Sequence, residues 1–164
     1  MSIAFNISKD KIGWYYEQAR NVTNAGLVFV LLKTANVEAD ATLADYDDLA
    51  TLLAGTSDEA DFTNYARKTF SGTSTIRKTV DDANNRVLLD EDDLTWVDAG
   101  NSATTAGSGS GNNNIARVVV CYDPDLTTGT DSSIVPLTSH DITVATDGND
   151  LIIRWHADGS ARVL

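Results

Sequence analysis

The chain has 164 residues, 42% of them hydrophobic and 22% charged, and its 24 acidic side chains outnumber its 12 lysines and arginines, which gives a net charge of -12. A chain of this length and composition is expected to fold as a single domain, residues 1–164, around its own hydrophobic core. Because an acidic surface repels phosphate and anionic lipid, the charge argues against nucleic acid and membrane as partners.

The single cysteine, Cys121, excludes an internal disulfide, and its place between Val120 and Tyr122 predicts a buried small hydrophobic side chain. Residues 1–10, which we interpret as an N-terminal arm, lack the basic flank and apolar run of a secretory signal. The longest apolar stretch, Ala25 to Leu32, is shorter than the ~20 residues that span a bilayer. We therefore expect a soluble protein that is made in a cytoplasm.

The first predicted element is a short amphipathic helix over residues 9–20. Apolar side chains recur there at three- and four-residue spacing: Ile12, Tyr15, Tyr16 and Ala19. Leu27 to Leu32 follows as a continuous apolar run. Periodicity alone would also fit a buried helix, but the length of the run and its β-branched content favour a strand.

The most regular helical pattern lies between Asp40 and Gly55. One face of the predicted helix carries Leu43, Tyr46, Leu49, Ala50 and Leu53. Asp45, Asp47 and Asp48 fall in the early turns, where the helix dipole favours carboxylates, and a glycine is typical of a helix end. We therefore predict one helix over residues 40–55.

From Phe62 onward the pattern is typical of β structure. Strands are predicted at residues 62–70, 74–80, 86–90 and 94–97. The polar turn at residues 81–85 predicts that the second and third of these form a hairpin. In the fourth strand, Leu94 and Trp96 are expected to face inward.

The segment from Asn114 to Asp123 is apolar on both faces of a strand, which predicts the central strand of a packed sheet. Its side chains divide into two sets, Val118, Val120 and Tyr122 on one face and Val119 and Cys121 on the other. The preceding segment, residues 100–114, has the Gly/Ser/Asn composition of a flexible linker. We interpret it as a long loop between two strands.

Further strands are predicted at residues 134–138, 141–146, 151–156 and 161–164. Pro136 should place its strand at an edge or a bulge, because proline cannot donate to a ladder. The spacing of all these segments predicts a mainly β protein. The expected fold is an antiparallel β-sandwich or barrel, jelly-roll-like, with one or two short helices in its N-terminal half.

Metal binding has weak candidates in Asp123, Asp125 and Asp131, which lie in a segment that superficially resembles a calcium loop. The match fails where Thr128 replaces the turn-forming glycine and Ile134 replaces the bidentate glutamate. A plain Asx-Pro turn explains the pattern better. We predict neither a metal nor a cofactor, and we interpret the acidic run at residues 90–93 as a charged strand terminus.

Enzyme chemistry has little support, because His140 and His156 are the only histidines and neither has a partner at metal-ligand spacing. A Ser-His-Asp set could be drawn from His140, Asp141 and several serines. No nucleophile elbow or phosphate loop accompanies them. We predict no catalytic residues and a non-enzymatic protein.

Trp14, Tyr15 and Tyr16 form an aromatic cluster near the N-terminus, and they are the candidate partner-binding residues. Tryptophan and tyrosine are favoured at the centres of interfaces. The alternative is that these side chains pack the chain's own helix onto its sheet.

Five segments of the chain form a recognisable series: Leu43–Ala50, a Tyr-x-Arg-Lys strand at Tyr65–Lys68, an Asp-x-x-Trp strand ending at Trp96, a Val-rich strand and Asp turn at Ala116–Asp123, and a Pro-Leu strand at Ile134–Leu137. Together they resemble small structural proteins of tailed-bacteriophage virions. The likeness extends from the helix near Asp45 to the turn at Asp147.

This resemblance implies a capsid decoration or cement protein, made in the host bacterial cytoplasm and located in the virion. Its partners would be the major capsid protein and other copies of itself, with a homotrimer on threefold axes as the natural arrangement. Residues 1–10 and 100–114 would order against neighbours. A neck or tail protein is the nearest alternative.

A second alternative is a soluble ligand-binding β-sandwich, such as a carbohydrate-binding module. A module of that kind should expose Trp96 or Trp155, whereas we expect both to be buried.

Overall fold

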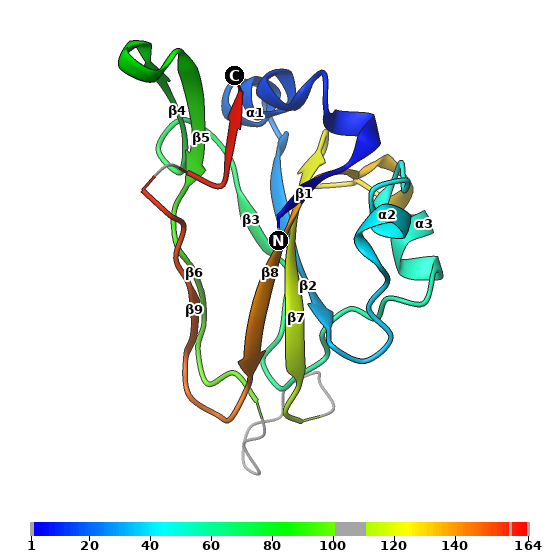
Figure 1. Ribbon diagram of the computed structural model, residues 1–164. Helices are drawn as coiled ribbons and strands as arrows, with labels where there is room; N and C mark the ends of the chain where they lie inside the picture. Colours follow the sequence, from blue (N-terminus) through cyan, green and yellow to red (C-terminus); the bar gives the residue numbers. More distant parts are fainter. Residues whose placement is uncertain (1, 101–110, 158, 164) are drawn as a thin grey trace.

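The computed structural model describes residues 2–100, 111–157 and 159–163. It is a mainly β structure of antiparallel sheets that stack as two layers (Figure 1). The predicted sandwich-like fold is therefore confirmed, and within these residues the sheets do not close into a barrel.

The first layer is a five-stranded sheet with the order β1-β8-β7-β2-β3. Its strands are β1 (Ile3–Ala4), β8 (Val135–Ala145), β7 (Asn114–Asp123), β2 (Gly26–Lys33) and β3 (Lys68–Phe70). The strand β7 lies in the middle of this order and has the predicted bounds. Its ladders with β2 and β8 hold the layer together.

The second layer combines a three-stranded sheet, β10-β5-β4, with a two-stranded sheet, β6-β9. Its strands are β4 (Ile76–Asp81), β5 (Arg86–Glu91), β6 (Leu94–Trp96), β9 (Leu151–Ile153) and β10 (Ala161–Val163). The chain runs from β5 into β6, and β10 and β9 pair with them on the same side, so the small sheets continue one another (Figure 1). A 3-10 turn, η2 (Asp82–Asn84), closes the predicted β4–β5 hairpin.

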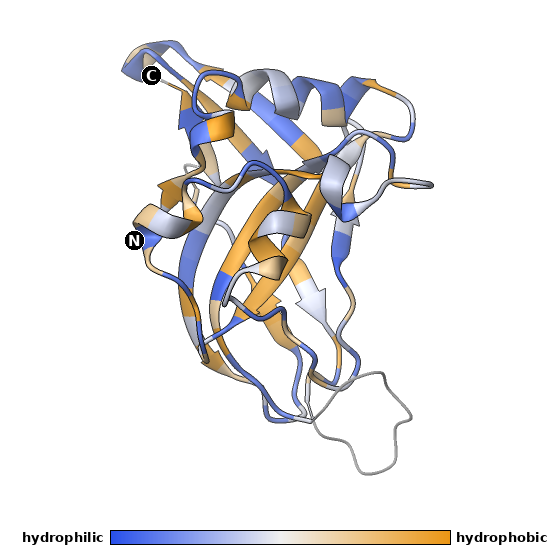
Figure 2. Ribbon diagram, turned by 90° about the vertical axis from the view of Figure 1, so that its right-hand side faces the viewer, coloured by the Kyte–Doolittle hydropathy of each residue, from blue (hydrophilic) through white to orange (hydrophobic). Residues whose placement is uncertain are grey.

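The helices cover both faces of the first layer. The helix α1 (Ile12–Asn21) fills one end of the space between the layers, while α2 (Asp40–Leu43), α3 (Leu49–Ala54) and the 3-10 turns η1 (Asn6–Ser8) and η3 (Asp131–Ser133) lie on the outer face. Figure 2 shows the hydrophobic strands of the first layer behind these short helices. Each face of the sheet therefore has its own core.

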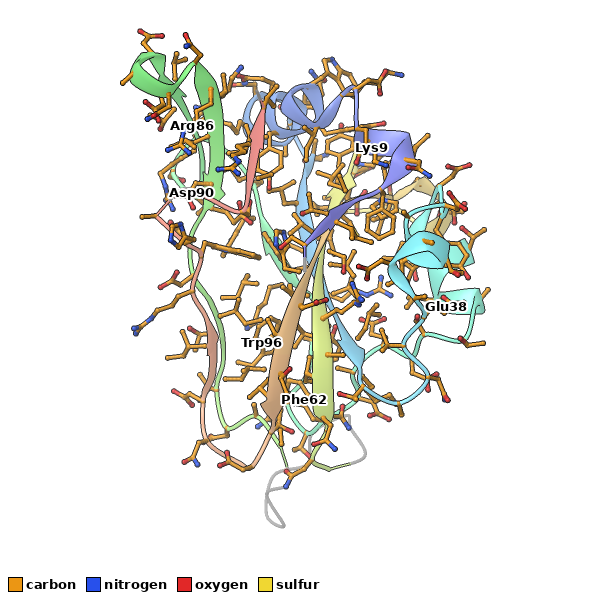
Figure 3. All side chains as sticks on the ribbon, viewed as in Figure 1. Lys9, Glu38, Phe62, Arg86, Asp90 and Trp96 are labelled. Carbon is orange, nitrogen blue, oxygen red and sulfur yellow. The ribbon has the colours of Figure 1, made fainter. Side chains whose placement is uncertain are left out.

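The two cores follow the alternation of β7. Val118, Val120 and Tyr122 belong to the cluster between the layers, and Val119 and Cys121 belong to the cluster under α2 and α3. The predicted two-faced burial of this strand is thus confirmed. Figure 3 shows Phe62 and Trp96 between the layers and Lys9, Glu38 and Arg86 at the periphery.

The prediction of one continuous helix over residues 40–55 is wrong, because the segment forms two short helices, α2 and α3. Asp48 lies between them in an extended conformation, and its carboxylate accepts a hydrogen bond from the backbone N–H of Thr51 at 2.8 Å. An aspartate that caps a new helix competes with continuation of the previous one.

The predicted strand over residues 62–70 is correct only at its end, where β3 begins at Lys68. Asn64 has a positive φ of 69°, and the N–H of Tyr65 donates to the carbonyl of Phe62 at 2.9 Å. Asparagine tolerates this left-handed conformation, so the chain turns here instead of extending.

The two strands predicted at residues 134–138 and 141–146 form one continuous strand, β8. Pro136 lies opposite Cys121, where the β7–β8 register shifts, so its predicted place at a bulge is confirmed. Most of the loop predicted at residues 100–114 lies outside the described residues.

The segment that we interpreted as an N-terminal arm packs on its own chain. Ile3 and Ala4 pair with β8, Phe5 is fully buried in the outer core, and the N–H of Phe5 donates to the carbonyl of Leu137 at 3.1 Å. Residues 2–8 are therefore part of the fold.

Candidate partner-binding site

The helix α1 places the three candidate aromatic residues in different environments. Successive residues of a helix point about 100° apart, so neighbours cannot share one face. Trp14 is 52% exposed, whereas Tyr15 is 9% exposed and Tyr16 is fully buried. Trp14 is thus the one residue of the cluster that a partner could cover over most of its side chain.

Trp14 lies on an aromatic base. Its ring meets the ring of Tyr15 edge-on, with centroids 5.1 Å apart, and Tyr15 in turn lies 5.1 Å from Tyr122 at the end of β7. The ring centroids of Trp14 and Tyr122 are 6.3 Å apart. Pairs at these separations contribute beyond the area they bury, so the base restricts how the Trp14 ring can lie.

A shallow depression of about 440 Å³ adjoins this ring. Its lining consists of Asp10, Lys11, Trp14 and Tyr15. An aromatic ring beside one acidic and one basic side chain can contact both apolar and polar groups of a partner. We refer to this depression and the Trp14 ring above it as the Trp14 patch.

Tyr16 is unavailable to a partner, because its hydroxyl belongs to a buried polar cluster. It lies 2.8 Å from the hydroxyl of Ser160 and 3.3 Å from Oε2 of Glu91, and Ser160 donates to the same oxygen at 2.7 Å. Burial, together with the nearby Glu91 carboxylate, raises the pKa of Tyr16 well above its usual value. The cluster ties α1, β5 and the start of β10 together.

Glu91 has an unusual protonation state for a carboxyl group. It is 1% exposed, and its Oε1 has no hydrogen-bond partner among the described residues. Burial raises its pKa to about 8, so the group is largely protonated at neutral pH. Our interpretation of residues 90–93 as a charged strand terminus is therefore wrong for Glu91, which faces the core.

His140 forms hydrogen bonds through both ring nitrogens, but to hydroxyl groups. Nδ1 lies 3.0 Å from the Ser2 hydroxyl and Nε2 lies 2.9 Å from the Thr138 hydroxyl. Asp141 is instead paired with Arg117 at 3.2 Å. Burial lowers the pKa of His140 to about 4. Among the described residues, no carboxylate orients its ring as a Ser-His-Asp set would require.

His140, Asp141 and His156 do line one groove, beside Trp155. Within the part of the chain that the structure describes, however, no group of three or more His, Cys, Asp or Glu side chains is arranged to hold a metal ion.

The three weak metal candidates take separate structural roles. Asp123 accepts from the N–H of Asp125 at 2.9 Å, and Asp125 accepts from the N–H of Thr127 at 3.0 Å. These contacts form Asx turns. Hydrogen bonds donated by the hydroxyl groups of Thr127 and Thr128 lower the pKa of Asp125 to about 2. Asp131 points elsewhere and forms an ion pair with Arg67 at 2.6 Å.

Two motifs of the virion-protein resemblance meet in one network around Arg67. Its guanidinium binds both oxygens of Glu59, at 2.8 and 2.7 Å, and both oxygens of Asp131, at 2.6 and 3.0 Å. Tyr65 donates to Glu59 at 2.8 Å, and its ring stacks on Trp96 with centroids 6.4 Å apart. These motif residues hold segments of the fold together.

The tryptophans that a carbohydrate-binding module should expose are mostly covered. Trp96 is 1% exposed, as expected, and its Nε1 donates to the carbonyl of Ala66 at 2.8 Å. Trp155 is only partly buried, and its Nε1 donates to the carbonyl of Asp92 at 3.1 Å. The expectation of burial is confirmed for Trp96 and met in part for Trp155.

Comparison of the chain with protein-family models, curated protein sequences and solved structures gives no match. Among the helices that the structure describes, none has the length and apolar content needed to cross a bilayer.

Proposed function

We propose that the protein is a non-enzymatic structural component of a tailed-phage virion, attached in multiple copies to the outside of the head. The major capsid protein would be its partner, and the Trp14 patch would be the surface that meets it. The single structural observation that carries the binding role is the half-exposed Trp14 ring on its buried tyrosine base.

The chemistry of the Trp14 patch suits a protein partner. Tryptophan is among the residues whose truncation costs most at interfaces, and anchors of this kind are effective when they are held in place before binding. Trp14 is held by Tyr15 and, through it, by Tyr122. A ring that is already oriented loses little side-chain entropy when a partner covers it.

The virion assignment is supported by the motif resemblance and by charge. A body with a net charge of -12 has little affinity for packaged DNA, which favours the outer surface of a head over its interior. The motif residues Tyr65, Arg67 and Trp96 act in the fold, as the shared motifs of a structural protein would.

Attachment in multiple copies would follow the symmetry of the shell. A trimer on each threefold axis gives every copy the same contact with the capsid lattice. Copies that are held together also bind more tightly than one copy alone, because the second contact becomes intramolecular.

Immunogold electron microscopy of purified virions tests the location. Antibodies against the recombinant protein should label the head surface at many sites on each particle. Labelling confined to the neck or tail would replace the head assignment with the neck or tail alternative. Virions that contain none of the protein by mass spectrometry would overturn the virion role.

A carbohydrate-binding module is the second candidate, because one exposed tryptophan beside Asp10 and Lys11 is also a suitable platform for a sugar ring. A glycan array probed with the protein and with a Trp14→Ala variant separates the two proposals. Micromolar binding to one glycan class that is lost in the variant would favour the module.

A further inference from the structure

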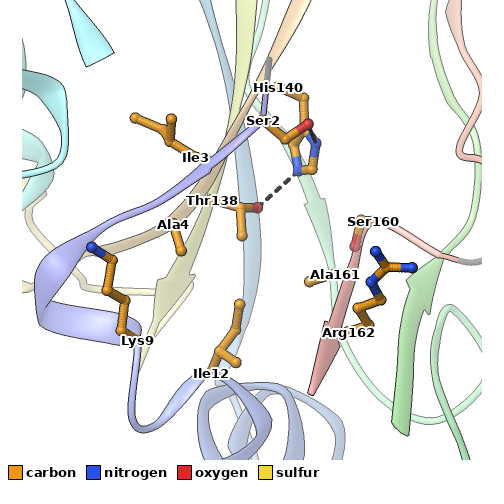
Figure 4. A pocket seen from close by; sticks show the side chains of 10 residues that line it. All are labelled: Ser2, Ile3, Ala4, Lys9, Ile12, Thr138, His140, Ser160, Ala161 and Arg162. Carbon is orange, nitrogen blue, oxygen red and sulfur yellow. Dashed lines mark hydrogen bonds between the residues drawn. The ribbon is translucent and has the colours of Figure 1, made fainter. Parts of the chain in front are cut away.

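The two layers of the sandwich are open along one side. There, β1 and β8 of the first layer face β10 and the segment after β9 across two adjoining hollows of about 320 and 310 Å³. Both hollows include Ser2, His140 and Ser160, so they form one continuous groove. Figure 4 shows Ser2, Thr138 and His140 across from Ser160 and Arg162, with Ile12 at one end.

Among the described residues, β8 has an unpaired stretch that begins at Ile142, which lines the groove, and continues beyond it. The short strand β1 covers only Thr138 and Ser139, and the adjacent Leu137 accepts from Phe5. From Ile142 to Ala145, the outer edge of β8 has no backbone hydrogen-bond partner among the described residues. On the opposite side, β10 is the outermost strand of its sheet, and in the described part of the chain its one partner is β5.

This edge lacks the side chains that commonly prevent strand addition. Edge strands are usually protected by lysine, proline or other charges, yet Ile142–Ala145 reads Ile-Thr-Val-Ala. The outer strand of the other layer, β4, is protected, because it carries Arg77 and Lys78. In contrast to β4, the stretch Ile142–Ala145 of β8 therefore has no charged side chain that would oppose the addition of another strand.

The groove also has a definite chemistry. Its apolar surface comes from Ile12, Ile142 and Trp155, and the rim carries Lys9, Arg154 and Arg162. Among the described residues, none that lines the hollow with Lys9 and Arg162 carries a carboxylate. In the other hollow, Asp141 is neutralised in part by Arg117. A positive rim on a chain of net charge -12 favours an acidic occupant.

We propose that this groove binds an extended, acidic segment of a partner polypeptide, which adds as a strand to the edge of β8 at Ile142–Ala145. Backbone pairing would supply the binding energy, and alternate apolar side chains would fill the groove while carboxylates meet the rim. The groove and the Trp14 patch share no lining residue, so this proposal does not depend on the virion role.

A blocked hexapeptide that alternates glutamate with valine is the probe, titrated into the ¹⁵N-labelled full chain at low salt. Amides of Ile142–Ala145 should shift and exchange more slowly with deuterium. A version with lysine in place of glutamate should bind about tenfold more weakly. A version N-methylated at alternate residues cannot form all the backbone hydrogen bonds with β8, so it should also bind about tenfold more weakly.

A pair of variants at Arg162 tests the rim, because Arg162 is exposed and has no ion-pair partner among the described residues. The Arg162→Glu variant should bind the acidic peptide about tenfold more weakly than the parent, while the Arg162→Lys variant should bind it as the parent does. The proposal is overturned if the N-methylated peptide binds as well as the parent peptide, or if the β8 amides do not respond.

Discussion

At the scale of single residues, Glu91 shows how burial can reverse the expected chemistry of an acidic side chain. The sequence placed it in an acidic run, yet it lies on the same strand face as Leu89, two positions earlier, and that face is buried. Strand alternation was therefore the signal that could have predicted its burial. Its contacts with Tyr16 and Ser160 could not be predicted, because they join distant parts of the chain.

Glu91 makes stability depend on pH. In the unfolded chain it ionises near its usual pKa of 4.5, whereas in the fold it holds its proton up to about pH 8. Between these values the unfolded chain has lost the proton and the native chain has not. The contribution of Glu91 to the free energy of unfolding therefore falls as pH rises through this window, by up to about 1.4 kcal/mol per pH unit, and it levels off above pH 8.

Glu91→Gln should remove this dependence and raise the free energy of unfolding at pH 8 relative to the parent, since glutamine can keep the hydrogen bond with Ser160 without a charge. Urea denaturation at several pH values between 5 and 8.5 measures how the free energy of unfolding of each variant depends on pH. The exposed Asp10→Asn is the matched control and should leave the profile unchanged. A parent whose stability does not fall between pH 5 and 8 relative to Glu91→Gln would show that Glu91 is ionised in the fold.

Arg67 should be the most sensitive ion-pair residue. Arg67→Ala leaves Glu59 and Asp131 without their shared cation in a half-buried site, so we expect a loss of about 3 kcal/mol in unfolding free energy. Arg154→Ala serves as the control, because its side chain is 75% exposed and its contact with Asp93 is 3.6 Å long. That change should cost less than about 0.5 kcal/mol. Equal losses in the two variants would refute the structural role of the Arg67 network.

At the scale of elements, the sequence predicted best those segments whose pattern is local. The strand β7 has the predicted bounds, because a segment that is apolar on both faces and flanked by turn residues fits a buried strand better than any other element. The break between α2 and α3 was not predicted, because an aspartate such as Asp48 can occupy either an exposed position within a helix or the N-cap of a new one. The order of strands could not be predicted at all, since pairs such as β2–β7 join residues far apart in the sequence.

The N-terminal segment provides a test at this scale. Phe5→Ala should lower the free energy of unfolding by about 3 kcal/mol, because the ring is fully buried against α2, α3 and the first layer. Ile7→Ala, at a side chain that is 36% exposed, should cost less than about 1 kcal/mol. Chemical denaturation of both variants decides the matter. A Phe5→Ala chain as stable as the parent would mean that residues 2–8 form a free arm after all.

At the scale of the whole molecule, the candidate partner-binding residues were only partly identifiable. The sequence marked Trp14, Tyr15 and Tyr16 together, but the phase of α1 relative to the core decided that Trp14 alone is largely exposed. The groove beside β8 left no sequence signal, because its lining comes from both ends of the chain and from β8. Surfaces built by topology become visible only in the fold.

The central claim is that the Trp14 patch attaches this protein to a larger assembly. Co-sedimentation with phage heads that lack the protein measures attachment directly, with Trp14→Ser compared with Val97→Ser, a change at another exposed apolar side chain. We expect Trp14→Ser to bind at least about tenfold more weakly and Val97→Ser to bind as the parent does. Equal binding of Trp14→Ser and the parent would contradict the account.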